Sequence, residues 1–141
     1  MQALYAASPD DYALRERPAP TLRPDEALVR VSRAAICYTD VIIRAGRAPH
    51  VRYPFVPGHE FAGVIEAIGD EAQGVQIGDR VAVHTIMGCG FCPRCRVGDQ
   101  TGCARYSELG SRRDGGFEKL CAVPARYMFA WPCLARRGRA V

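Results

Sequence analysis

Apolar and polar residues alternate along several short stretches of this chain. The clearest are residues 26–36 (EALVRVSRAAI), over their first half, and residues 60–68 (EFAGVIEAI). Alternation with a period of two is typical of a strand with one buried face. Further strands are predicted at 1–5, 12–17, 80–84, 117–123 and 127–130, and a short helix at 39–45. Many short strands with little helix indicate a mainly β fold, a closed or partly closed barrel.

Residues 86–116 do not fit this pattern. They contain seven glycines and four cysteines but few apolar runs, so the segment cannot bury much surface. A bound metal ion is the simplest way to hold such a segment in one shape. We therefore expect a metal-binding lobe at about residues 86–116.

The composition narrows the class of protein. A chain of 141 residues suits one domain, and the net charge of +4 comes from scattered arginines rather than a basic stripe, which does not favour nucleic-acid binding. We expect no membrane helix and no secretory signal. Seven cysteines, an odd number, argue against a secreted disulfide framework and favour the reducing cytoplasm with metal-bound thiolates.

Four of the cysteines, Cys89, Cys92, Cys95 and Cys103, form the pattern Cys-x2-Cys-x2-Cys-x7-Cys. Four closely spaced thiolates can close a tetrahedral shell around one Zn²⁺ and leave no coordination position open, as in a structural site. Free or buried cysteines are one alternative, and an iron–sulfur cluster is another. The glycines and proline between the cysteines favour the metal over simple packing.

A second group of candidate ligands is Cys37, His59 and Glu60. Each residue alone has an ordinary explanation: a buried cysteine, a structural histidine and an exposed glutamate. Cys37 follows one predicted strand, however, and His59 and Glu60 begin another. Adjacent strand ends can bring three protein ligands to one metal with an open fourth position, which is the catalytic zinc arrangement.

These motifs resemble the zinc-dependent medium-chain alcohol dehydrogenases. Five segments carry the resemblance, in the family's order, from about residue 1 to residue 132: Ile36-Cys37-Tyr38-Thr39-Asp40; Gly58-His59-Glu60-Phe61-Ala62-Gly63 with Gly69 and Ala72; Gly78-Asp79-Arg80-Val81; the four-cysteine segment; and Gly115-Gly116-Phe117 with Val123-Pro124-Ala125. Ile42 stands where some members have a proton-relay histidine, so the resemblance favours the polyol, sorbitol and threonine dehydrogenase branches.

The resemblance implies the GroES-like catalytic domain of these enzymes, a partly open β-barrel with short helices and a zinc lobe. It implies a catalytic zinc on Cys37 and His59, with Glu60 as a ligand or a nearby carboxylate. Thr39 would take the alcohol proton, and Asp40 would orient the imidazole of His59. It also implies an alcohol or polyol substrate, NAD(P) as hydride acceptor, two Zn²⁺ per chain, and homo-oligomeric full-length relatives.

The family's Rossmann domain has no counterpart in this sequence, which contains no Gly-x-Gly-x-x-Gly. We expect residues 1–132 to form the GroES-like domain and residues 133–141 an atypical arginine-rich tail left by a truncation or a frameshift. The chain is then a fragment of a dehydrogenase, inactive by itself. The alternative is a non-catalytic zinc module for protein or nucleic-acid interaction, which has no need of a second, open metal site.

Overall fold

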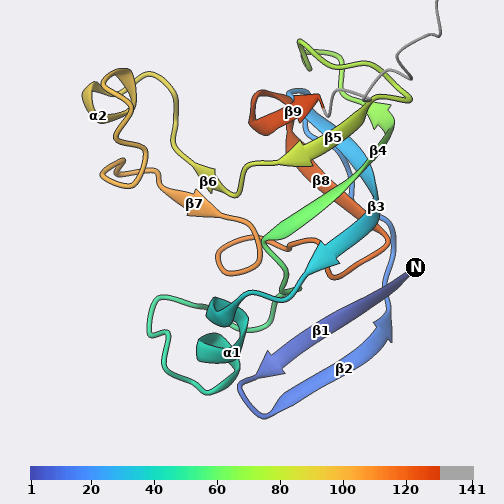
Figure 1. Ribbon diagram of the computed structural model, residues 1–141, viewed down its shortest axis with the longest axis vertical. Coiled ribbons are helices and arrows are strands. Elements are labelled where there is room, and N and C mark those ends of the chain that lie inside the picture. The colour runs from blue at the N-terminus through green and yellow to red at the C-terminus, as the bar shows by residue number, and fades with distance from the viewer. Residues whose placement is uncertain (131–141) are drawn as a thin grey trace, which may run out of the picture.

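The computed structural model describes residues 1–130 (Figure 1). The tail predicted at 133–141 therefore lies outside the described residues. No helix within the described part of the chain is long and apolar enough to cross a membrane.

The elements follow in the order β1 (Gln2–Ser8), β2 (Asp11–Glu16), β3 (Glu26–Ala35), α1 (Tyr38–Arg44), β4 (Glu60–Ile68), β5 (Arg80–Val83), β6 (Ile86–Met87), α2 (Pro93–Arg96), β7 (Ser107–Glu108), β8 (Leu120–Pro124), a 3₁₀ turn (Ala125–Tyr127) and β9 (Met128–Ala130).

A five-stranded antiparallel sheet forms the body of the molecule, with strand order β8-β3-β4-β5-β9. The β1–β2 hairpin is a separate sheet, which joins the rest through isolated bridges from Ala3 to Glu118 and from Ala6 to Phe55. The sheets keep open edges rather than closing into one continuous barrel. This is the partly open form of the mainly β fold that the sequence predicts.

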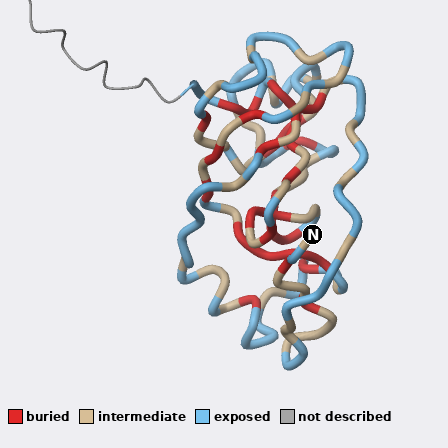
Figure 2. Tube along the Cα trace, turned by 90° about the vertical axis from the view of Figure 1, so that its right-hand side faces the viewer, coloured by how far each residue is buried: buried red, intermediate tan, exposed pale blue. Residues whose placement is uncertain are grey.

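The alternating pattern of β3 and β4 places one face of each strand in the main core. Figure 2 shows the buried residues gathered in the interior and the exposed ones along the outer loops. Val29 and Ile65 are buried there against Val81 of β5 and Val123 of β8. Two register shifts in the β3–β4 pairing change which residues face the core, so the alternation of β3 ends after its first half. A smaller core of Ala6, Ile43, Val51 and Phe55 joins the hairpin to α1.

Some elements of the structure differ from the sequence prediction. The strand predicted at 117–123 begins only at Leu120, because the backbone of Phe117 bonds elsewhere: its N–H donates to Pro57 and its carbonyl accepts from Leu4. The short helix α2 was not predicted, since it spans one turn inside the cysteine segment. The helix predicted at 39–45 is confirmed as α1, displaced by one residue.

The segment from β6 to β7 stands out from the body as a lobe (Figure 1). Between Cys89 and Tyr106, Cys103 is the one residue that is buried. The lobe therefore has almost no hydrophobic core of its own, in agreement with the expectation that it needs another source of stability.

A buried carboxylate on the loop before β8 makes stability depend on pH. Burial, with the nearby charge of Asp114, raises the pKa of Glu118 from 4.5 to about 7, although Arg17 lies 3.8 Å away. The folded state therefore holds a proton that the unfolded chain releases. The stabilisation is full below pH 4.5 and is lost as the pH rises through 7, by on the order of 2–3 kcal/mol.

We expect Glu118→Gln to remove most of this loss. Urea unfolding at pH 5 and pH 8 measures it, with Glu66→Gln as a control because Glu66 pairs with Arg30 on the exposed face. An unchanged pH dependence in Glu118→Gln would contradict the assignment.

Candidate metal centres

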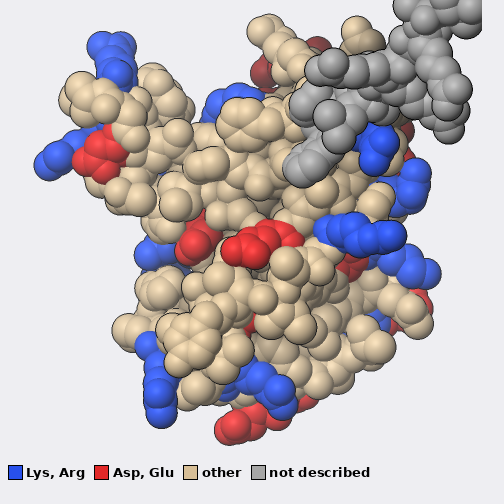
Figure 3. Space-filling view, viewed as in Figure 1, with Lys and Arg blue, Asp and Glu red and all other residues tan. Residues whose placement is uncertain are grey.

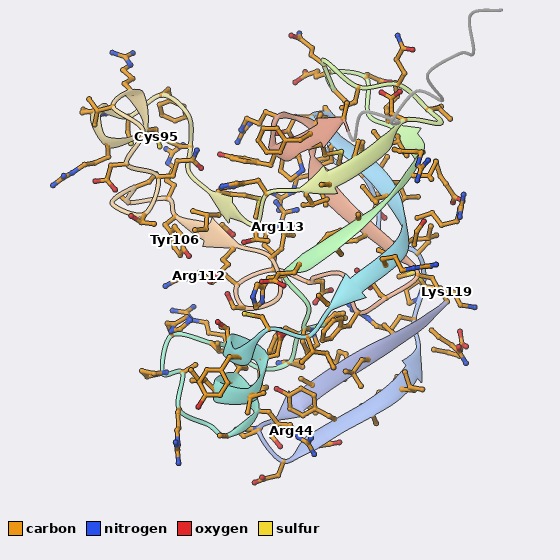
Figure 4. The ribbon with its side chains drawn as sticks, viewed as in Figure 1. Arg44, Cys95, Tyr106, Arg112, Arg113 and Lys119 are labelled. Atoms are coloured by element: carbon orange, nitrogen blue, oxygen red, sulfur yellow. The ribbon has the colours of Figure 1, made fainter. Side chains whose placement is uncertain are left out.

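The four-cysteine cluster has the dimensions of a zinc site. Its four sulfur atoms all lie within 4.8 Å of one another. The Sγ atoms of Cys92 and Cys103 are 3.8 Å apart, and those of Cys89 and Cys95 are 4.0 Å apart. Tetrahedral coordination with Zn–S bonds of about 2.3 Å places thiolates about 3.8 Å from one another. The donor set therefore suits Zn²⁺. Figure 4 marks Cys95 within the lobe.

The local backbone builds this cluster. Cys92 is the N-cap of α2 and Pro93 takes the first helical position, which suits its fixed φ. Backbone N–H groups donate hydrogen bonds of 3.3–3.5 Å to three of the sulfurs. Cys89 and Arg105 donate to Cys103, Cys92 donates to Cys89, and Cys95 donates to Cys92. Such donors stabilise thiolates.

The thiols of the lobe cannot all ionise by themselves. Backbone hydrogen bonds, the largest from Phe91, lower the pKa of Cys89 to about 6. A hydrogen bond from the backbone of Gly90 also lowers the pKa of Cys95. Burial and the neighbouring thiols outweigh it and raise the pKa of Cys95 to about 11. One thiolate thus opposes the next, and a cation between them removes that repulsion.

The second group, Cys37, His59 and Glu60, is also brought together. Each offers a ligand atom, and these atoms all lie within 4.8 Å of one another. The β3–β4 register explains why: Ala35 pairs with Glu60, so the residues just beyond the end of β3 meet the start of β4. Cys37 and His59 are partly buried and Glu60 is exposed, which leaves one side of the group open. Three ligands with an open side suit a catalytic zinc.

Asp40 connects the members of this second group. Its Oδ2 accepts a hydrogen bond from the backbone N–H of Cys37 at 2.8 Å. Its Oδ1 lies 3.5 Å from Nδ1 of His59 and has no hydrogen-bond partner within the described residues, although it is buried. Asp40 is the main reason that the pKa of His59 rises to about 9, against the effect of burial. A carboxylate on Nδ1 orients the ring and leaves Nε2 for a metal.

Thr39 lies beside the thiol of Cys37. The two side chains are 3.6 Å apart, and hydrogen bonds from Thr39, first from its backbone, lower the pKa of Cys37, with a further contribution from His59. A hydroxyl at this position can exchange a proton with a group held at the metal. One place in the fold therefore holds Thr39, Asp40, Cys37, His59 and Glu60.

The pockets of the described residues lie at different places relative to the two metal groups. A pocket of about 420 Å³ includes Cys89 of the four-cysteine cluster in its lining. Another of about 350 Å³ is lined by Ile36, Asp40, Val41 and Phe117, among others, and shares Asp40 with the second group. A pocket of about 430 Å³, lined by Arg17, Arg113 and Glu118, contains no residue of either metal group.

Within residues 1–130, the other histidines and the other cysteine stay outside both groups. His84 contacts the carbonyl of Ile86 through Nδ1 at 2.9 Å and stacks near Tyr127. Cys121 is buried in the main core, and Cys133 lies outside the described residues. The sequence did not predict that residues 115–117 form backbone hydrogen bonds with residues 56–58, directly before His59. No pattern in the sequence points to this contact between distant segments.

The chain is similar to known proteins in both sequence and fold. The family model "Alcohol dehydrogenase GroES-like domain" matches residues 23–133. The starvation-sensing protein RspB of Escherichia coli is 38% identical over 132 residues, which is 94% of this chain and 39% of that protein.

Two solved structures extend the comparison. Galactitol-1-phosphate dehydrogenase from Escherichia coli superposes with a TM-score of 0.87 at 32% identity, covering 94% of this chain and 38% of that one. A cobalt- and zinc-bound alcohol dehydrogenase from Pyrobaculum aerophilum gives 0.86 at 32% identity, covering 94% and 41%. The chain thus spans about two fifths of the length of the proteins it matches.

Proposed function

The chain belongs to the alcohol dehydrogenase GroES-like domain family, and from this premise we propose that it is the zinc-binding catalytic part of an NAD(P)-dependent alcohol or polyol dehydrogenase. The observation that carries the proposal is the convergence of Cys37, His59 and Glu60 within 4.8 Å, with an open side. The match to a galactitol-1-phosphate dehydrogenase supports a polyol as substrate. NAD(P) would accept the hydride, since protein side chains cannot.

Each residue of the second group, with Asp40 and Thr39, has a role in this proposal. A zinc ion held by Cys37 and His59, with Glu60 as ligand or nearby carboxylate, would polarise the oxygen of the substrate and lower the pKa of an alcohol. Asp40 holds the imidazole in one orientation from the Nδ1 side. Thr39 would take the hydroxyl proton of the substrate, and its side chain lies 3.6 Å from the sulfur of Cys37.

The four-cysteine lobe has a different role in the proposal. Its closed set of four thiolates would hold a second Zn²⁺ that shapes the lobe and takes no part in the reaction.

The six cysteines of the described residues are all free of disulfides, which supports a reducing cytoplasm as the location. Figure 3 shows positive and negative side chains interspersed on one face, without a broad basic patch for nucleic acid.

Metal content tests the proposal. We expect two Zn²⁺ per chain in the purified protein, one for each group of ligands. The double variant Cys37→Ala/His59→Ala should retain one, because the lobe is untouched, and Cys92→Ala should also retain one, in the other site. Mass spectrometry of the native protein together with elemental analysis measures both.

The competing function predicts another result. A non-catalytic zinc module would hold a single Zn²⁺ that survives Cys37→Ala/His59→Ala and disappears in Cys92→Ala. That pattern would contradict the dehydrogenase proposal.

A further inference from the structure

The segment that leads into His59 is held along its length by a second loop. Residues 56–58 lie against residues 115–117, and three consecutive backbone hydrogen bonds join them. These are Gly115 N–H to Val56 O at 2.8 Å, Phe117 N–H to Pro57 O at 3.0 Å and Gly116 N–H to Gly58 O at 2.6 Å. Because His59 is the next residue, the position of its backbone follows that of this loop.

Asp114 anchors the beginning of the contact with its side chain. Its Oδ1 accepts a hydrogen bond from the backbone N–H of Val56 at 2.8 Å, and its Oδ2 accepts one from Nη2 of Arg17 at 2.8 Å. Arg17 follows the β1–β2 hairpin. One carboxylate therefore ties the hairpin, its own loop and the segment before His59 together, and its charge makes both hydrogen bonds strong ones.

The two segments pack so closely that movement of one moves the other. A Cβ atom on Gly115 would lie 2.1 Å from the carbonyl oxygen of Gly58, and one on Gly110 would lie 2.9 Å from the carbonyl carbon of Gly58. Gly58 itself has a φ of +90° and lies against the ring of Phe117. Since no free space separates the backbones, a shift of residues 114–117 reaches His59 directly.

We propose that Asp114 is a positioning residue for the second metal centre: through Val56 it sets where His59 and Glu60 stand relative to Cys37. The inference rests on the proposed function, because it assumes that these three residues bind a metal. Asp114 touches neither metal nor substrate in this scheme. Its effect appears in the geometry and affinity of the site, and the four-cysteine lobe is unaffected.

Cobalt binding tests this. The full chain is first loaded with zinc at the lobe, and Co²⁺ is then titrated while the thiolate-to-cobalt absorption is followed. We expect Asp114→Ala to weaken Co²⁺ binding about 10-fold or more, the size of effect seen when groups behind metal ligands are removed. The absorption bands should shift as well, because the ligand geometry changes. The control Asp11→Ala, which removes an exposed pair with Arg15, should bind as the wild type does.

Asp114→Asn is a second, milder variant. Its single amide oxygen can serve only one of the two donors, so we expect an affinity between those of wild type and Asp114→Ala. If Asp114→Ala fails to fold, the test rests on Asp114→Asn. Weaker Co²⁺ binding by Asp114→Asn, with zinc retained in the lobe, then supports the inference. Wild-type affinity and spectrum in the variants that fold would overturn the inference but not the proposed function. A wild-type chain that takes up no cobalt beyond the lobe would overturn both.

Discussion

Replacement of Cys103 by alanine is expected to abolish zinc binding by the lobe and to unfold residues 89–106, while the five-stranded sheet remains folded. Cys103 is the one buried residue of that stretch, and its sulfur accepts the backbone N–H groups of Cys89 and Arg105. The described lobe thus has no apolar core to replace the metal. Structural zinc contributes on the order of 10 kcal/mol to the folding of small zinc-dependent units.

Hydrogen exchange provides the measurement. The amides of Arg96 and Tyr106, which donate to the carbonyls of Cys92 and Cys103 in the lobe, should lose protection in Cys103→Ala. Amides of β3 and β4 should keep theirs, because their pairing lies in the body. Cys121→Ala is the matched control: it also removes a buried thiol, but from the main core, and should keep both zinc ions. Unchanged protection of the lobe in Cys103→Ala would contradict this account of its stability.

The second large effect is expected from Gly115→Ala, which should destabilise the fold by about 3 kcal/mol or more. The new Cβ would stand 2.1 Å from the carbonyl oxygen of Gly58 and 2.7 Å from the Cα of Gly110. Both neighbours are backbone atoms, so neither can rotate away as a side chain would. The loop must move, and the segment before His59 must move with it.

A glycine with open space around it separates the effect of crowding from the effect of backbone strain. Gly74 has a φ of +75°, and no atom lies within 4 Å of the place that a Cβ would take, so Gly74→Ala carries only the strain of its conformation, about 1 kcal/mol. Chemical denaturation of both variants gives the two free energies of unfolding. Equal losses of unfolding free energy in the two variants would show that residues 114–116 can relax. They would contradict the close packing of this loop against Gly58.

The main strands could be predicted from the sequence because their alternation reflects burial on one face. Residues 60–68 match β4 fully, since the whole segment pairs with β3. Phe117 could not be placed in the same way. It is apolar and next to a real strand, but its backbone groups bond to Pro57 and Leu4, partners about 60 and 110 residues away in the chain.

The candidate metal groups were accessible from the sequence for a similar reason. Spacing reveals the four cysteines because they are local, and strand ends reveal Cys37 with His59 because β3 and β4 are adjacent. The contribution of Asp114 was not accessible. It depends on a hydrogen bond to Val56, 58 residues earlier, and on the packing of glycines that carry no chemical signal of their own.

X-ray absorption at the zinc edge tests the central claim most directly. Five cysteines and one histidine belong to the two groups, so a fully loaded chain should show about 2.5 sulfur ligands per zinc, with nitrogen or oxygen completing the shells. Cys37→Ala/His59→Ala should raise this to about four sulfurs per remaining zinc. Four sulfurs per zinc in the wild-type chain, with no nitrogen or oxygen, would contradict the existence of a second, open zinc site.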